Sequence, residues 1–279
     1  MSDCQVFFIL SSGRSGTQTL QRLFGQFPQV EMHHEYLCTH VQPLAIKYYL
    51  GRITRQAAIH ELGKWHGQAV RFCRFPFWGD SSNKLSWLIE PLADLFPQAK
   101  FVHLVRDGRN VVSSFFHKLK DECYDDISWS SYRSWVENPS AETEPPPEKK
   151  YWWPHPRQMV SGWQNWSRFE RLCFYWCEVN RIIEEDSRPL KEGLFHYLRL
   201  EDLVSKVESY TQLLRFLGLP IEAEPFTSLR RPHNVNIPQH FPLTSEQMAI
   251  FSRMCGATMS HYGYRMEDDY AVNYHPDGW

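Results

Sequence analysis

A short glycine-containing segment near the start of the chain has the form of an anion-binding loop. It reads G-R-S-G-T at residues 13–17 and stands between an apolar run at residues 5–10 and an amphipathic segment at residues 17–27. A buried strand that opens through such a turn into a helix directs unpaired backbone N–H groups and the positive helix end at one point. The segment therefore predicts a pocket for an anionic group.

This loop differs from the loop that binds nucleoside triphosphates. The signature of that loop, G-x-x-x-x-G-K-[ST], requires a lysine directly after the second glycine. Here Thr17 follows the second glycine, and the cation, Arg14, lies inside the loop. The pattern disfavours hydrolysis of a nucleoside triphosphate.

Strands and helices are expected to alternate around the loop. Residues 5–10 lack polar alternation, which is typical of a strand buried on both faces, and the spacing of the apolar residues from 20 to 27 predicts a helix. A second unit has a strand at 101–105, a turn at 106–109 and a helix through 111–116. Alternating strands and helices predict an α/β fold with a central parallel sheet, flanked by helices, that binds ligands at the carboxyl ends of its strands. Further elements are predicted as helices at about 85–96, 161–185 and 207–217 and a strand at 194–200.

We expect one domain over residues 1–279, because no Gly/Ser-rich linker divides the chain into two halves. Between about residues 121 and 156 the periodicity fails, and three consecutive prolines at 145–147 exclude a helix or a central strand. This stretch is predicted to be an insertion or a lid.

Residues 13–17 resemble the 5′-phosphosulfate loop of sulfotransferases that use 3′-phosphoadenosine 5′-phosphosulfate (PAPS), in the arginine variant of the carbohydrate and protein-tyrosine enzymes. Residues 105–114, V-R-D-G-R-N-V-V-S-S, resemble the family's 3′-phosphate segment. In that segment an arginine that ends a strand and a serine eight residues later hold the same phosphate. Arg106 and Ser114 stand at these positions, and a guanidinium at a strand end can converge with a hydroxyl two helical turns further on.

The resemblance implies PAPS as sulfuryl donor, 3′,5′-adenosine bisphosphate (PAP) as product, and no metal. Gln18 departs from the family, which often has a second threonine there, and Thr19 could supply the missing hydroxyl. A basic pair at 230–231 stands where related enzymes fold a loop over the nucleotide, and it could complete the 3′-phosphate site or be solvated. The predicted donor-binding residues are Gly13, Arg14, Ser15, Gly16, Thr17, Gln18, Thr19, Arg106, Ser114, Arg230 and Arg231.

Sulfuryl transfer needs a base for the acceptor hydroxyl, and Glu35 is our candidate. It lies 21 residues after Arg14, where the tyrosine and carbohydrate members of the family place their catalytic glutamate. His34 is the next candidate, ahead of Glu31 and His33; alternatively, Glu35 is a solvated loop carboxylate and the histidines lie on a helix surface. Adjacent residues seldom converge on one metal ion, so we discount a metal site here.

Positive charge on the leaving phosphate oxygen is the other requirement of the reaction. Lys84 stands where the family commonly carries a lysine or serine near the bridging oxygen, and Arg14 could share this task; a solvated lysine is the alternative. The segment at 198–203 resembles the family's Tyr-Glu-Asp-Leu segment but has Leu200 in place of the tyrosine, so no catalytic role is assigned to it.

Composition limits the other functional classes. With 30 basic and 32 acidic residues the net charge is −2, which lacks the excess positive charge of proteins that coat nucleic acid or anionic membranes. The apolar run at residues 6–10 is far shorter than the roughly 20 residues of a membrane-spanning helix, and no secretion signal is recognisable, so we expect a cytoplasmic protein. Seven scattered cysteines indicate reduced thiols.

The sequence thus predicts a sulfotransferase that moves a sulfuryl group from PAPS to the hydroxyl of a small-molecule or glycan acceptor. Two alternatives remain at this point: a kinase-like nucleotide-dependent phosphoryl transferase, and a non-catalytic nucleotide-binding protein. The first lacks the lysine and hydroxyl residue of the triphosphate loop. Glu35 and Lys84 favour catalysis over the second. The sequence does not identify the acceptor or the oligomeric state.

Overall fold

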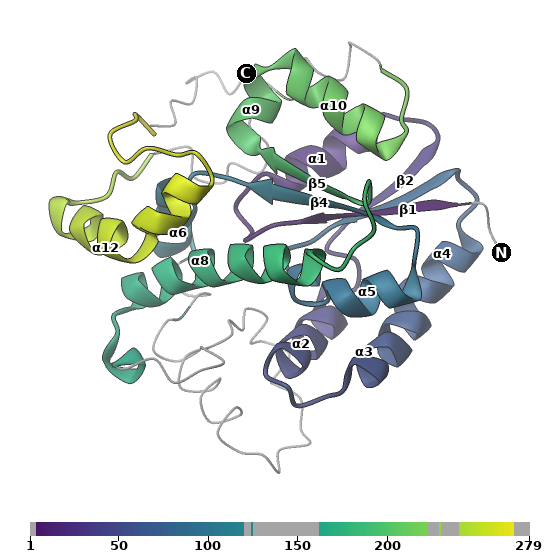
Figure 1. The fold of residues 1–279 in the computed structure, drawn as a ribbon, viewed down its shortest axis with the longest axis horizontal. Coiled ribbons are helices and arrows are strands. Elements are labelled where there is room, and N and C mark those ends of the chain that lie inside the picture. Colours follow the sequence, from purple (N-terminus) through teal and green to yellow (C-terminus); the bar gives the residue numbers. More distant parts are fainter. Residues whose placement is uncertain (1–3, 120–123, 125–161, 222–228, 230–239, 271–279) are drawn as a thin grey trace.

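The computed structural model describes residues 4–119, 124, 162–221, 229 and 240–270. Within these ranges the chain alternates between strands and helices around a single parallel sheet (Figure 1). The strands are β1 (Gln5–Leu10), β2 (Val30–His34), β3 (Phe77–Ser81), β4 (Lys100–Val105) and β5 (Phe195–Arg199). The α-helices are α1 (Thr17–Phe24), α2 (Cys38–Tyr49), α3 (Arg55–Leu62), α4 (Gln68–Phe72), α5 (Ile89–Leu95), α6 (Gly108–Lys118), α8 (Arg168–Ser187), α9 (Leu200–Ser205), α10 (Val207–Leu217) and α12 (Ser245–His261). Shorter helical turns are the π-helical η1 (Gly63–Gly67) and the 3₁₀ turns η2 (Leu85–Trp87) and η3 (Trp163–Asn165).

The sheet has the strand order β2-β3-β1-β4-β5, and every neighbouring pair is parallel. β1 lies at its centre, and its last four residues, 7–10, are completely buried. Because all five strands run the same way, their carboxyl ends lie at one edge of the sheet. The loops that leave this edge carry the residues for which the sequence predicts chemistry.

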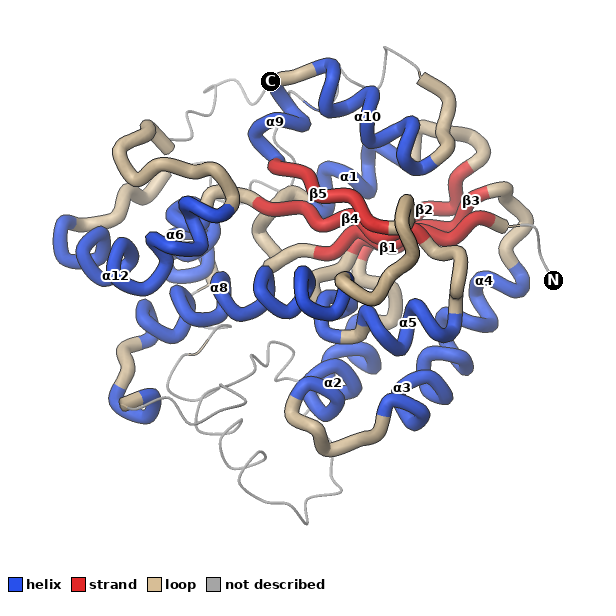
Figure 2. Tube along the Cα trace, in the orientation of Figure 1, coloured by secondary structure: helices blue, strands red, loops and turns tan. Residues whose placement is uncertain are grey.

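Helices cover both faces of the sheet, as Figures 1 and 2 show. Helices α1, α9 and α10 lie on one face, where Phe7 and Ile9 of β1 pack with Leu20 and Leu23 of α1. Helices α2 to α5 and α8 lie on the other face, against which Phe8 of β1 packs. Helices α6 and α12 pack on α8. The fold is the predicted α/β class, with alternate residues of each buried strand serving opposite layers.

Several predicted elements are confirmed, and others differ at their ends. The strand at 5–10 and the helix at 207–217 have the predicted bounds, and β4 begins one residue earlier than predicted. Helix α1 ends at Phe24 rather than Phe27, because the chain turns at Gly25. The stretch at 85–96 divides into η2 and α5.

The long helix predicted at 161–185 begins only at Arg168. Ser167 caps it: its hydroxyl accepts the N–H of Glu170, and the Glu170 side chain accepts the N–H of Ser167. This reciprocal pair satisfies two N–H groups of the first turn and fixes the start of the helix. The tryptophans at 163 and 166 therefore lie before α8, in and after the turn η3.

Strands β2 and β3 and helices α2 to α4 are absent from the prediction. The histidines at 33 and 34 end strand β2 and do not lie on a helix surface, which corrects the alternative considered for them. In the described part of the chain, the longest helices are too short or too polar to cross a membrane. The cysteines described in the structure are free thiols.

Candidate functional site

The loop between β1 and α1 requires glycine at both of its glycine positions. Gly13 has a φ of 76° and Gly16 a φ of 93°, in the left-handed region that side chains disfavour. A Cβ atom on Gly13 would lie 2.7 Å from Nδ2 of Asn83, and one on Gly16 would lie 2.8 Å from Cδ1 of Leu200. The loop is therefore bent by its backbone conformation and packed tightly against two neighbouring segments.

Serine hydroxyls hold the loop from within. The Ser11 hydroxyl accepts the N–H of Gly13 (3.0 Å), and the Ser15 hydroxyl donates to the carbonyl of Gly13 (3.0 Å). From outside, the Tyr175 hydroxyl of α8 donates to the carbonyl of Ser12 (2.8 Å). These bonds order the loop before any ligand binds, which is what a preorganised anion site needs.

The first turn of α1 continues this loop. Gly16 is its N-cap and offers no side-chain acceptor to the first N–H groups of the helix. Thr17 is buried, whereas Gln18 and Thr19 are partly buried. Oε1 of Gln18 is inaccessible to solvent and has no hydrogen-bond partner among the described residues. The helix start therefore has no side-chain cap for its first N–H groups, which lie beside the glycine turn.

Three residues proposed to bind the donor meet beside this loop. Nε of Arg14 donates to the hydroxyl of Ser114 in α6 (3.0 Å), and Nη1 of Arg106, just after β4, donates to the carbonyl of Arg14 (2.8 Å). Arg14 also has a positive φ of 54°. The two segments that the sequence predicts to bind phosphate are thus in direct contact, although many residues separate them along the chain.

More cations gather at the same edge. Burial lowers the pKa of Lys118, and the nearby charges of Arg14 and Arg106 lower it further. Burial and Lys118 also lower the pKa of His240, and Arg106 contributes, while Asp269 opposes the shift. The repulsion between these positive charges would be relieved by an anion bound at this edge of the sheet.

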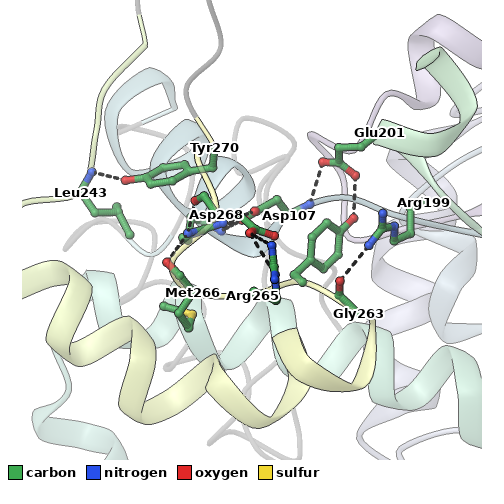
Figure 3. A network of polar contacts seen from close by, with 11 residues as sticks. Asp107, Arg199, Glu201, Leu243, Gly263, Arg265, Met266, Asp268 and Tyr270 are labelled. Atoms are coloured by element: carbon green, nitrogen blue, oxygen red, sulfur yellow. Dashed lines mark hydrogen bonds and ion pairs between the residues drawn. The ribbon is translucent and has the colours of Figure 1, made fainter.

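A polar network supports the end of β4, and Figure 3 shows it. The backbone N–H of Asp107, directly after Arg106, donates to Oε1 of Glu201 (3.1 Å). The Tyr264 hydroxyl donates to the other carboxylate oxygen (2.6 Å), and burial together with this carboxylate raises the pKa of Tyr264. Glu201 belongs to the segment at 198–203 to which the sequence assigns no catalytic role, and here it holds the backbone beside Arg106.

Arg109 extends this network to the C-terminal segment of the described chain. Only 1% of this residue is exposed, and its guanidinium forms an ion pair with Asp107 (2.7 Å). Its Nη1 donates to the carbonyls of Met266 (2.7 Å) and Asp268 (3.0 Å), and it lies over the ring of Tyr270. Arg109 therefore fastens residues 266–270 to the start of α6, a role that its place in the sequence motif does not reveal.

Glu35 lies across the sheet from this network, directly after β2. Its Oε1 is 2.7 Å from Nζ of Lys84, which follows β3. The Lys84 side chain is 8% exposed and the Glu35 side chain 29% exposed, so the amine is buried while the carboxylate can be reached from solvent. Lys84 also donates to Oδ1 of Asn83, the residue that packs against Gly13. The candidate base and the candidate leaving-group cation are thus direct neighbours beside the anion loop.

The histidines near Glu35 have other partners. Nδ1 of His34 lies 2.9 Å from the carbonyl of Ser81 and 3.2 Å from its hydroxyl. His33 pairs with Glu31 at 3.0 Å. The hydroxyl of Ser81 in turn donates to the carbonyl of Thr17 (3.0 Å), which links the end of β3 to the start of α1.

Two predictions fall outside the described residues. One is the assignment of Arg230 and Arg231 to the donor site. The other is the predicted insertion at 121–156, of which the structure describes Tyr124 alone, a buried residue. Within the described residues, no three His, Cys, Asp or Glu side chains are grouped as metal ligands would be.

Comparison with known proteins identifies one family. The model of the sulfotransferase family matches residues 6–138, a range that contains Arg14, Glu35, Lys84, Arg106 and Ser114. No curated protein matches the chain.

Solved structures share the fold at low identity. A sulfotransferase domain from the Synechococcus PCC 7002 olefin synthase is 18% identical with a TM-score of 0.50, over 90% of this chain and 86% of that one. A sulfotransferase from Alicyclobacillus acidocaldarius is 13% identical with a TM-score of 0.50, over 93% and 96%. At such identities the likeness concerns the fold, and the family rests on the matched residues. Over residues 6–138, which include both segments predicted to bind phosphate, the chain matches the sulfotransferase family.

Proposed function

We propose that this enzyme takes the sulfuryl group of PAPS, the donor generally used by the family, and transfers it to an acceptor hydroxyl with Glu35 as the base. One observation carries the proposal: the ion pair between Glu35 and the buried Lys84, at 2.7 Å, lies next to the glycine loop. Lys84 donates a hydrogen bond to Asn83, and Asn83 packs against Gly13 of that loop. A base and a cation are the two groups that sulfuryl transfer requires: the base takes the proton of the acceptor hydroxyl, and the cation stabilises the leaving phosphate oxygen.

The residues around the loop fit the donor. Hydroxyls of Ser11, Ser15 and Tyr175 order the loop, and the helix that follows it begins without a side-chain cap, an arrangement suited to a phosphosulfate group. Arg106 and Ser114 are proposed to hold the 3′-phosphate, and the repulsion that lowers the pKa of Lys118 supports an anion at this edge. The Arg14–Ser114 bond would have to exchange for bonds to the donor, because both groups are proposed as its ligands.

The proposed chemistry is an in-line displacement at sulfur. The acceptor oxygen forms a bond to sulfur while the bond from sulfur to the bridging phosphate oxygen breaks, and the acceptor's proton passes to Glu35. Negative charge accumulates on the leaving oxygen, where the amine of Lys84 and the guanidinium of Arg14 would stabilise it. The partial exposure of Glu35 leaves its carboxylate accessible to an acceptor hydroxyl, as base catalysis requires.

Replacement of the carboxylate by an amide tests the base. Glu35→Gln keeps the size of the side chain but removes its proton acceptor, so turnover should fall roughly 10²- to 10⁴-fold while PAP affinity changes less than about two-fold. Transfer rates at saturating PAPS and PAP calorimetry would be measured in parallel. Glu184→Gln is a matched control, because this carboxylate is 31% exposed and pairs with His261 on the surface, and its rate should be unchanged.

His34→Gln supplies the competing forecast. If His34 were the base, this variant would lose most of its turnover and Glu35→Gln would be only mildly affected. A near-wild-type rate for Glu35→Gln would exclude Glu35 from the mechanism. Failure of the wild-type protein to bind PAP would overturn the proposed donor.

A further inference from the structure

A buried pair of ionisable side chains lies behind Glu35. Asp80 is in β3, and His66 is in the π-helical turn η1, between α3 and α4. Both side chains are 0% exposed, and Nε2 of His66 lies 3.6 Å from Oδ2 of Asp80. Neither residue is part of the proposed donor site or of the proposed proton transfer.

Asp80 contacts the turn that carries Glu35. Its Oδ1 accepts the backbone N–H of Tyr36 (3.3 Å), the residue directly after Glu35. The N–H of Glu35 donates to the carbonyl of Ser81, the residue directly after Asp80 (3.1 Å). Two consecutive residues of β3 therefore hold two consecutive N–H groups of the turn.

The turn needs such support because its backbone is in an unfavourable conformation. Glu35 has a φ of 54° and Leu37 a φ of 49°. For a residue with a side chain, the left-handed region is unfavourable and persists only where surrounding contacts maintain it. The direction of the Glu35 carboxylate depends on this backbone, so the contacts that maintain the turn also set the position of the proposed base.

His66 is placed to complete the support. Neither of its ring nitrogens has a hydrogen-bond partner among the described residues, and neither does Oδ2 of Asp80. Buried polar groups without partners are costly, and a small closure of the 3.6 Å gap would satisfy one atom of each residue. The ring of Tyr36 also meets His66 edge to face, with 5.3 Å between ring centres. Tyr36 thus contacts Asp80 through its backbone and His66 through its ring.

We propose that Asp80, with His66 as its hydrogen-bond donor, is a positioning residue for Glu35. The inference rests on the proposed function of Glu35 as the base. In this arrangement Asp80 fixes the Tyr36 N–H, His66 fixes the Asp80 carboxylate, and the turn holds Glu35 toward Lys84. Neither Asp80 nor His66 touches a substrate.

Paired variants at each position test the proposal. Asp80→Ala removes the acceptor for the Tyr36 N–H, and kcat should fall about 10- to 100-fold with PAP affinity and the KM for PAPS within about two-fold, because a small misplacement of a catalytic group costs rate rather than binding. Asp80→Asn keeps an acceptor oxygen and should restore most of kcat. At the partner residue, His66→Leu should lower kcat more than His66→Gln, since glutamine can still donate to Asp80. The His66 pair also tests the proposal if Asp80→Ala does not fold.

A double variant separates positioning from general weakening of the fold. If Asp80 acts only through Glu35, then Asp80→Ala should change the residual rate of Glu35→Gln by less than about two-fold. An equal loss of rate in both backgrounds would overturn the positioning role, as would equal rates for Asp80→Ala and Asp80→Asn. His103→Gln is the matched control, a fully buried histidine bonded to Asn180, and it should lower the melting temperature with kcat unchanged. If Glu35→Gln alone retains wild-type activity, the proposed base fails rather than the contact analysis.

Discussion

The two sides of the sheet's carboxyl edge are built differently. On the β4–β5 side, Asp107, Arg109 and Glu201 each make two or more hydrogen bonds, and the C-terminal segment closes over them. On the β2–β3 side, the His66 ring and Oδ2 of Asp80 are buried without a hydrogen bond among the described residues. The turn beside them contains two left-handed residues.

The contrast indicates a division of tasks. A densely bonded region can hold several cations in place for the 3′-phosphate of a bound nucleotide, which takes no part in the transfer. A strained turn held by hydrogen bonds from β3 can place a base with the angle that the reaction needs, so each of those contacts matters for rate. We therefore expect variants on the β4–β5 side to affect donor binding and those on the β2–β3 side to affect turnover.

After Glu35→Gln, the largest effect in this comparison is expected for Lys84→Met. Loss of the cation beside the leaving oxygen should lower the single-turnover transfer rate about 10²- to 10³-fold, because this charge acts mainly on the transition state. PAP affinity, measured by calorimetry, should fall by less than about ten-fold. Lys64→Met is a control with a comparable ion pair, to Glu61 at 2.6 Å, on the exposed surface. Equal losses of binding and rate in Lys84→Met would break the comparison.

Arg106→Ala should show the reverse pattern. A charge-assisted contact to a phosphate contributes on the order of 1.5–3 kcal/mol, so PAP affinity should fall about 10- to 150-fold. Arg14→Ala should weaken binding similarly but should also slow transfer, because Arg14 is proposed to stabilise the leaving oxygen. Ser114→Ala should be milder, because a neutral hydroxyl contributes less. Arg253→Ala, which breaks an exposed pair with Glu170, provides the control. Unchanged PAP affinity in both arginine variants would contradict the proposed donor site.

A smaller effect concerns His103, the buried histidine on the β4 side. Burial lowers its pKa from 6.5 to about 4, against the opposing effect of its bond to Asn180. Between pH 6.5 and about 4 the unfolded chain therefore binds a proton that the folded chain excludes. The free energy of unfolding is at its full value above pH 6.5 and decreases as the pH falls toward 4, by up to roughly 1.4 kcal/mol per pH unit. Urea unfolding at several pH values should give a flatter profile for His103→Gln than for the wild type. Parallel profiles would show that His103 does not contribute.

Sequence patterns predicted the central part of this fold and missed one edge. The strand at 5–10 is a continuous apolar run after Gln5, which a strand buried on both faces produces. In β3 the apolar residues Phe77 and Trp78 are followed by Gly79, Asp80 and Ser81, which are buried although they are small or polar. The sequence of β3 therefore lacks the apolar run by which a buried strand is recognised. Such local exceptions are expected where residues serve a site rather than the core.

The candidate site was predictable one segment at a time, but its contacts were not. Arg14, Glu35 and Arg106 stand at recognisable positions in the chain. The pair between Glu35 and Lys84 depends on the register of β2 against β3, which aligns His34 with Ser81. The supporting roles of Asp80, Glu201 and Arg109 likewise depend on tertiary contacts between segments far apart in sequence.

The strand order also governs how the active edge forms during folding. No pair of neighbouring strands can form a hairpin, and β1 must meet β3 and β4, with Gln5 opposite Phe77 and Phe7 opposite Lys100. Each pairing thus requires closure of a long loop of chain, which makes such topologies slow to fold. Arg14, Glu35, Lys84 and Arg106 leave four different strands, so no early hairpin-like intermediate can bring them together. A newly made chain acquires its chemistry only when the whole sheet closes.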